Sequence, residues 1–167
     1  MGLIRKAALP DNSCGIPQEY YNVAIVEAKA QKSKRTGADM IVLKLEILSP
    51  KEVPVEGKLV RTQGRKFDHY IVASENDNRW VKEIETLLGD ELPAEVDSTE
   101  LAIGAAADLQ GMVLMNVSLK AEERYKNQPG TYEPEIVNGQ KVVTGYGIRF
   151  ADANRPRAIS AEAAGLA

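Results

Sequence analysis

The sequence predicts a mainly β domain that carries one clear helix. Three local patterns support this fold class: alternating apolar residues over 41–47, a helical apolar stripe over 79–88, and the hairpin dipeptide Asn138-Gly139. The chain has 167 residues, of which 44% are hydrophobic and 27% charged. These values are ordinary for one globular domain with a sizeable core.

The first half of the chain predicts three strands. Residues 20–30 alternate weakly, and residues 40–48 alternate strongly until Pro50 ends the run. The inward face of the second strand consists of Ile41, Leu43, Leu45 and Ile47. A third strand is expected over 58–72, bent at Gly64, because glycine inside a strand often marks a bulge.

Helical signals follow these strands. The predicted helix over 79–88 has a plausible cap at Asp77 or Asn78 and stops at Gly89. Its apolar stripe consists of Trp80, Ile84, Leu87 and Leu88. Residues 97–100 have the pattern of a capping box, which predicts one short helical turn that ends before Gly104.

Two further strands complete the prediction. The fourth begins near Gly111, and its inward residues are Val113, Met115, Val117 and Leu119. An extended hairpin over 135–143 follows, in which Asn138-Gly139 supplies the two positive-φ positions of a type I′ turn. The last strand is expected over about 141–150.

The order is therefore strand, strand, strand, helix, strand, strand. A five-stranded Greek-key barrel of the OB type has this order, although small α+β sheets share it. Such barrels bind oligonucleotides on one face and with the loops after strands one and four. We expect an N-terminal arm over 1–17, an OB-fold domain over 18–152, and a flexible C-terminal tail over 153–167.

Charge is segregated along the chain. The net charge is −3, but residues 75–100 hold nine acids and only two bases, a net charge of −7. The remainder therefore carries +4. The loop of the first hairpin is basic, because Lys29, Lys32, Lys34 and Arg35 lie between Ala28 and Ala38 with no acid among them. Such a cluster favours a polyanionic partner.

Catalytic signals are weak, so we do not expect an enzyme, a metal site or a cofactor. His69 is the one histidine and Cys14 the one cysteine, and neither has an obvious partner. No phosphate-binding glycine loop of the P-loop kind occurs, and Gly145 and Gly147 are spaced like turns or strand kinks. The single cysteine fits the reducing cytosol, and no signal peptide or membrane span is indicated.

Basic and aromatic residues interleave, as a single-stranded nucleic-acid site requires. Cations bind phosphates, and rings offer surfaces on which bases stack. Tyr132 is a further ring in this pattern. The predicted nucleic-acid contacts are Tyr21, Lys32, Lys34, Arg35, Lys44, Arg61, Arg65, Lys66, Phe67, His69, Tyr70, Lys120, Arg124, Tyr125, Lys126 and Tyr146.

Other interpretations of the same residues stay open. Any one tyrosine could pack in the core instead of stacking on a base, and the basic loop could serve solubility alone. The acidic region 75–100 could bind a basic protein or mimic nucleic acid, which would make the chain an interaction or virion protein. Strand annealing, rather than coating, is a third alternative, and the sequence leaves the oligomeric state open.

Residues 20 to about 150 resemble a family of bacteriophage proteins now identified as OB-fold single-stranded DNA-binding proteins. The shared features are the hairpin Tyr20–Ile47 with its Ser-Lys-x-x-Gly loop, then Phe67-Asp-His-Tyr70, Trp80 and Leu109-Gln-Gly111. The resemblance implies coating of single-stranded DNA in phage replication or recombination, inside an infected bacterium. It also implies replication or recombination proteins as partners. Because the chain ends with one acid in residues 161–167, recruitment through an acidic tail is not predicted.

Overall fold

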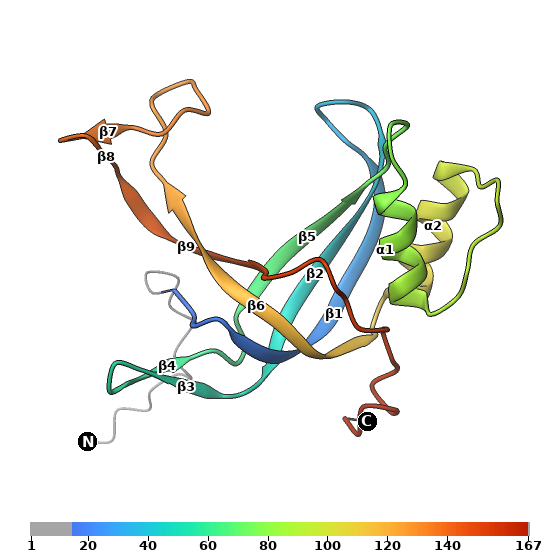
Figure 1. Cartoon of the computed structure of the whole chain (residues 1–167), viewed down its shortest axis with the longest axis horizontal. Helices are drawn as coiled ribbons and strands as arrows, with labels where there is room; N and C mark the ends of the chain where they lie inside the picture. The colour runs from blue at the N-terminus through green and yellow to red at the C-terminus, as the bar shows by residue number, and fades with distance from the viewer. Residues whose placement is uncertain (1–14, 167) are drawn as a thin grey trace, which may run out of the picture.

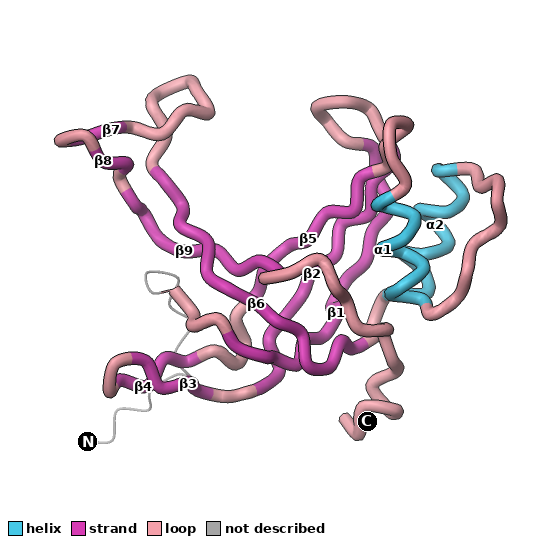
Figure 2. Tube along the Cα trace, in the orientation of Figure 1, coloured by secondary structure: helices cyan, strands magenta, loops and turns pink. Residues whose placement is uncertain are grey.

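The computed structural model describes residues 15–166, so Cys14 and most of the predicted N-terminal arm lie outside the described residues. Its centre is a five-stranded antiparallel sheet in the order β5-β2-β1-β6-β9 (Figures 1 and 2). The strands are β1 (Glu19–Lys32), β2 (Asp39–Ser49), β5 (Lys66–Val72), β6 (Val113–Tyr125) and β9 (Val143–Phe150). The mainly β class is thereby confirmed.

The sheet does not close into the predicted barrel. Strands β5 and β9 form its two edges and make no ladder with each other. They meet through side chains, because the rings of Phe67 and Phe150 lie edge to face with centroids 5.9 Å apart. In Figure 1 the β1–β2–β5 part and the β6–β9 part diverge as two arms from this junction.

Strand β2 has the predicted alternation. Ile41, Leu43, Leu45 and Ile47 are each 1% exposed and face the core. Strand β1 follows its predicted pattern only at first: Tyr21, Val23 and Ile25 are buried, but the next buried residue is Ala28. The register shifts between Ile25 and Glu27, where a bulge exchanges the two faces of the strand.

Strand β6 contains a second irregularity that changes its inward face. Asn116 has φ of 55°, and its neighbours Leu114 and Val117 are both buried. Met115, which was expected inward, is only half-buried. The side chain of Asn22 holds this bulge: its Oδ1 accepts from the Asn116 N–H at 2.9 Å, and its Nδ2 donates to Ser49 Oγ at 2.8 Å. One polar side chain thus links three strands.

The predicted third strand is two separate elements. Strand β4 (Lys58–Arg61) pairs with β3 (Glu52–Val55) in a hairpin of its own, and only β5 joins the main sheet. The break falls at Gly64, whose φ of 87° interrupts the extended chain. This hairpin projects from the end of the molecule opposite the β1–β2 loop (Figure 1).

Two helices, rather than one, lie between β5 and β6. Helix α1 (Arg79–Leu88) has the predicted bounds and ends at Gly89 in the left-handed conformation. Helix α2 (Ser98–Leu109) starts at the predicted cap, where Asp97 accepts from the Glu100 N–H at 2.9 Å. It continues through Gly104, because its apolar residues pack against β1 and β2. Its buried side chains are Leu101, Ala102, Ala105, Ala106 and Leu109.

The predicted hairpin between β6 and β9 is confirmed. Strands β7 (Ile136–Val137) and β8 (Gln140–Lys141) pair around Asn138 and Gly139, whose φ angles are 52° and 77°. These angles match a type I′ turn. The hairpin extends the β6–β9 arm (Figure 1).

Part of the expected flexible tail packs against the fold. The Ala158 N–H donates to the Leu87 carbonyl at 2.8 Å, and Ile159 exchanges two backbone hydrogen bonds with Val113. The Arg155 guanidinium lies 3.9 Å from the Phe150 ring centroid. Residues 155–159 therefore join the end of β9 to α1 and to the start of β6.

We predict that Asn22→Ala lowers the free energy of unfolding by about 1–2 kcal/mol, because two hydrogen bonds that join β1 to β2 and β6 are lost. Urea denaturation followed by circular dichroism measures the change. Asn76→Ala is the control, since Asn76 is exposed in a loop. An unchanged midpoint for Asn22→Ala would show that the bulge does not need this side chain.

Candidate nucleic-acid interface

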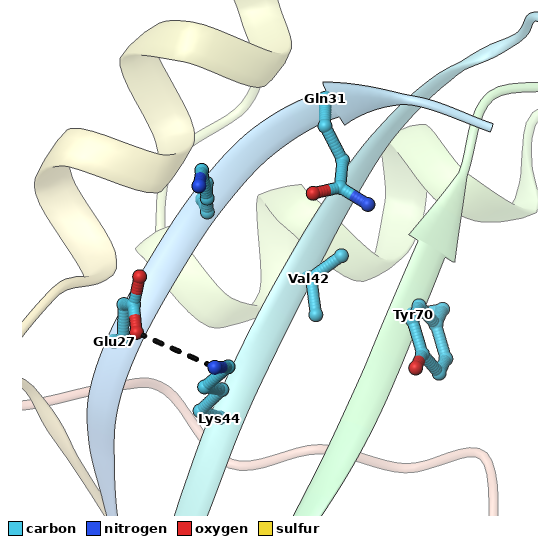
Figure 3. A pocket seen from close by; sticks show the side chains of 6 residues that line it. Glu27, Gln31, Val42, Lys44 and Tyr70 are labelled. Carbon is cyan, nitrogen blue, oxygen red and sulfur yellow. Dashed lines mark ion pairs between the residues drawn. The ribbon is translucent and has the colours of Figure 1, made fainter. Parts of the chain in front are cut away.

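The outer face of β1, β2 and β5 carries a shallow polar hollow. The cross-strand pairs Glu27–Lys44 and Val42–Tyr70 place these side chains on one face, and Figure 3 shows the helices behind the sheet. A cavity of about 230 Å³ opens there. Its lining residues are Glu27, Lys29, Gln31, Val42, Lys44 and Tyr70.

A second cavity lies in the seam between β5 and the β6–β9 arm. It has a volume of about 480 Å³ and shares Tyr70 with the first cavity. Its other lining residues are Lys66, Phe67, Asp68, Glu122, Arg124, Ile148 and Arg149. The two hollows therefore meet at one exposed ring, which is 53% accessible.

A third cavity lies between the loops of the two arms. Lys34 and Arg35 from the β1–β2 loop and Tyr132 from the loop before β7 line a space of about 610 Å³. Tyr132 is 99% exposed. The basic loop thus faces an aromatic side chain that comes from a segment almost a hundred residues later in the sequence.

Basic side chains predominate along these three cavities, which hold seven Lys or Arg residues and three acids. Two of the cations have acidic neighbours: Lys44 lies 3.7 Å from Glu27, and Lys66 lies 3.9 Å from Glu46. In the described part of the chain, the other five form no ion pair; they are Lys29, Lys34, Arg35, Arg124 and Arg149. We name this surface, from the β1–β2 loop to the seam, the basic groove.

Three predicted contacts are largely buried, although Phe67 also lines the seam cavity. Tyr21 and Arg65 are each 1% exposed, and Phe67 is 5% exposed. The Tyr21 hydroxyl donates to the Pro17 carbonyl at 2.8 Å. Burial raises the pKa of Tyr21 to about 12, and Glu19 acts in the same direction. These residues belong to the core or its margin, so they offer little surface to a ligand in this structure.

Lys32 is exposed but forms an ion pair within the fold. Its Nζ lies 2.6 Å from Asp39 Oδ1, across the pair that closes the β1–β2 ladder. Asp39 Oδ2 also accepts from the hydroxyls of Ser98 and Thr99 at the start of α2. The hydrogen bonds from Lys32 and Ser98 lower the pKa of Asp39 below its ordinary value of 3.8. Through Asp39, Lys32 therefore belongs to a hydrogen-bonded cluster that links the sheet to the start of α2.

His69 faces the inner side of the sheet rather than the groove. Its Nε2 lies 2.5 Å from Glu83 Oε1 on α1, and its ring meets Phe150 edge to face at 4.7 Å. Arg155 Nε lies 3.7 Å from the same Glu83 oxygen. Desolvation lowers the pKa of Arg155, whereas Glu83 acts in the opposite direction. This cluster joins β5, β9, α1 and the C-terminal segment.

The remaining predicted contacts lie outside the lining of the groove. Arg61 is on the separate β3–β4 hairpin, where its Nε donates to the Gln63 carbonyl. Lys126 pairs with Glu135 at 3.3 Å. A hydrogen bond to Glu123 raises the pKa of Tyr125, and Lys141 lies over its ring. The other two are Tyr146 and Lys120. The Tyr146 ring lies beside Gly15, and Lys120 is directly opposite Arg149 in the register of β6 and β9.

The groove therefore combines Lys34, Arg35, Lys44, Lys66, Tyr70 and Arg124 from the predicted set. Arg149 was missed, although its place in the alternating last strand was a usable signal. The sequence indicates Tyr132 only as a further ring, because no local pattern shows that it lies opposite the first hairpin.

The acidic region is partly occupied by internal contacts. Glu83 bonds His69, Glu85 accepts from the Leu92 N–H at 2.8 Å, and Asp97 caps α2. These acids organise the two helices and the connection between them.

Comparison with known protein families assigns part of the chain. A family model described as protein of unknown function, DUF669, matches residues 13–102, from just before β1 into α2. The chain belongs to the DUF669 family. No curated protein matches it.

Residues 15–166 contain neither a membrane-spanning helix nor a cluster of side chains suited to a metal ion. Neither α1 nor α2 is long and apolar enough to cross a membrane. Within this described part of the chain, no three histidine, cysteine or acidic side chains are grouped so that they could hold a metal ion.

We predict that Asp39→Asn lowers stability at neutral pH and reduces its acid dependence. The folded-state pKa of Asp39 is depressed, so its carboxylate contributes stability above the unfolded pKa and loses it as pH falls through the folded pKa. Urea unfolding at pH 7, 4 and 3 should therefore show the variant and the parent converging at acidic pH. Asp90→Asn, at an exposed acid, is the control, and a constant difference across the series would contradict the prediction.

Proposed function

We propose that this DUF669 protein binds and coats single-stranded DNA along the basic groove, without strong sequence preference. The observation that carries the proposal is the convergence of five cations, which form no ion pair within residues 15–166, with Tyr70 and Tyr132, drawn from both arms. Non-specific single-strand sites combine a basic channel with exposed rings. Base stacking needs an accessible π-face and no fixed pattern of hydrogen bonds.

The arrangement of strands supports an OB-type relationship as part of this proposal. Strands β1, β2, β5, β6 and β9 correspond in order to the five strands of that fold, and α1 and α2 fall between the third and fourth. The OB ligand surface is the face of strands two and three with the loops after strands one and four. Here these are the β2–β5 face, the loop with Lys34 and Arg35, and the arm with Tyr132.

The proposed mechanism divides the groove by chemistry. Phosphates lie near the loop cations and near Arg124 and Arg149 in the seam. Bases stack on Tyr70 and Tyr132, each contributing about 1–3 kcal/mol. Following the phage resemblance, we further propose a role in replication or recombination in the cytoplasm of an infected bacterium, with proteins of those pathways as partners.

Charge reversal in the loop tests the proposal directly. We predict that Lys34→Glu with Arg35→Glu strongly weakens binding of a fluorescein-labelled oligo-dT, measured by anisotropy, because the two cations at the mouth become repulsive. The parent should show a log-affinity against log-salt slope of roughly −2 to −3, at about −0.7 per phosphate contact. Reversal should make this slope shallower.

Lys51→Glu with Lys58→Glu is the matched control. These lysines are equally exposed but flank or belong to the β3–β4 hairpin, outside the groove. If both double variants lose the same affinity for oligo-dT, binding depends on net charge alone and the groove is not the binding site. A parent with no affinity for oligo-dT at low salt would overturn the function itself.

Removal of the central ring gives a second test. We predict that Tyr70→Ala weakens oligo-dT binding roughly 5- to 150-fold, which corresponds to the loss of one stacked base at about 1–3 kcal/mol. Tyr70→Phe should keep most of the affinity, because the π-face remains. Since Tyr70 is 53% exposed, both variants should unfold at similar temperatures. Equal affinity of the alanine and phenylalanine variants would exclude stacking at this position.

A further inference from the structure

Gly147 has a role that its backbone conformation does not explain. It lies inside β9 opposite Glu122, and neither it nor Gly145 has a positive φ. The β6–β9 ladder has a register shift beside Gly145, where Arg124 pairs with Gly145 and Tyr125 with Val143, but Gly147 lies in regular pairing. Glycine weakens the interior of a strand, and there it often marks a place where another group approaches the backbone closely.

The approaching group is the guanidinium of Arg124. A Cβ atom on residue 147 would lie 2.6 Å from Arg124 Nε, 2.8 Å from Nη2 and 3.1 Å from Cζ. Such distances are too short for any real side chain. The edge of the guanidinium that carries Nε and Nη2 thus occupies the space that only glycine leaves open.

We propose that Gly147 is a positioning residue, which seats Arg124 in a subsite for a backbone phosphate together with Arg149 and Lys66. All three cations line the seam cavity beside Tyr70. This inference rests on the proposed function and adds to it the place where the strand's phosphate is held. A phosphate here would lie next to the ring on which the neighbouring base stacks.

The seam cavity is lined by three cations and two acids, Asp68 and Glu122, so its net charge still favours an anion. Lys120 and Arg149 face each other directly across β6 and β9, and like charges in such a pair destabilise a sheet. Arg124 forms no ion pair in the described part of the chain. The planar, multiply donating guanidinium fits phosphate oxygens in a way that a lysine ammonium does not.

Gly147→Ala separates this role from folding. The substitution should displace the Arg124 side chain and weaken oligo-dT binding about tenfold, the size expected for one charge-assisted contact. The salt slope should become shallower by about 0.7, the share of one phosphate. The thermal unfolding midpoint should stay equal or rise, because alanine restricts the unfolded chain more than glycine does.

Two controls identify the cause. Gly104→Ala, on α2 with open space around it, should stabilise the protein without changing affinity. Arg124→Ala should weaken binding as much as Gly147→Ala does, and the double variant should be no weaker than either. Unchanged affinity of Gly147→Ala, or additive losses in the double variant, would overturn the positioning role while leaving single-strand binding intact.

Inorganic phosphate tests the subsite without any DNA. Its titration, followed through arginine Nε–H signals in NMR spectra, should shift the Arg124 resonance in the parent and not in Gly147→Ala. If phosphate shifts Arg124 while no oligonucleotide binds, the subsite stands and the proposed function fails. If phosphate leaves Arg124 unchanged, the phosphate subsite is refuted, whatever the result with the oligonucleotide.

Discussion

The shape of the molecule depends on β1, the long strand that both arms share. Its start pairs with β6 through Glu19–Ala24, and nearly its whole length pairs with β2. One register shift, at residues 22–23, lies where β1 pairs with both β2 and β6. The other, at residues 25–27, lies just after the pairing with β6 ends. Bulges increase local twist and bend a strand. The arms therefore diverge around β1, and the basic groove is the space between their outer faces and loops.

Strand parity decides which side chains reach that groove. In β5, residues 67, 69 and 71 face inward opposite residues 45, 43 and 41 of β2, so the even-numbered residues face outward. Tyr70 and Lys66 are therefore accessible, whereas Phe67 and His69 join the interior contacts with Phe150. A shift of one residue would bury the ring that the proposed function needs.

Local sequence patterns are enough to predict much of the fold. The alternation of residues 41–47, the stripe of α1 with Gly89, and the Asn138-Gly139 turn each depend on neighbouring residues alone. The bulges at Val26 and Asn116 depend on tertiary pairing, so the face of β1 was misassigned after Ile25. In β6, Leu114 is buried in place of the predicted Met115, whereas Val117 and Leu119 face inward as predicted. The seam could not be predicted either, because residues 66 and 149 meet only once the whole sheet has formed.

The distribution of ion pairs suggests why the groove would prefer a flexible strand. Lys44 on its floor and Lys66 in the seam already have Glu27 and Glu46 as neighbours, and Val42 and Tyr70 add apolar surface. Of the five cations that form no ion pair in the described part of the chain, four lie at the two ends, in the β1–β2 loop and in the seam, and Lys29 lies on the floor. The proposed DNA ligand would therefore turn bases toward the floor and most of its phosphates toward the ends. A single strand with unstacked bases can do so, whereas the paired bases of a duplex face each other and leave phosphates along its whole surface.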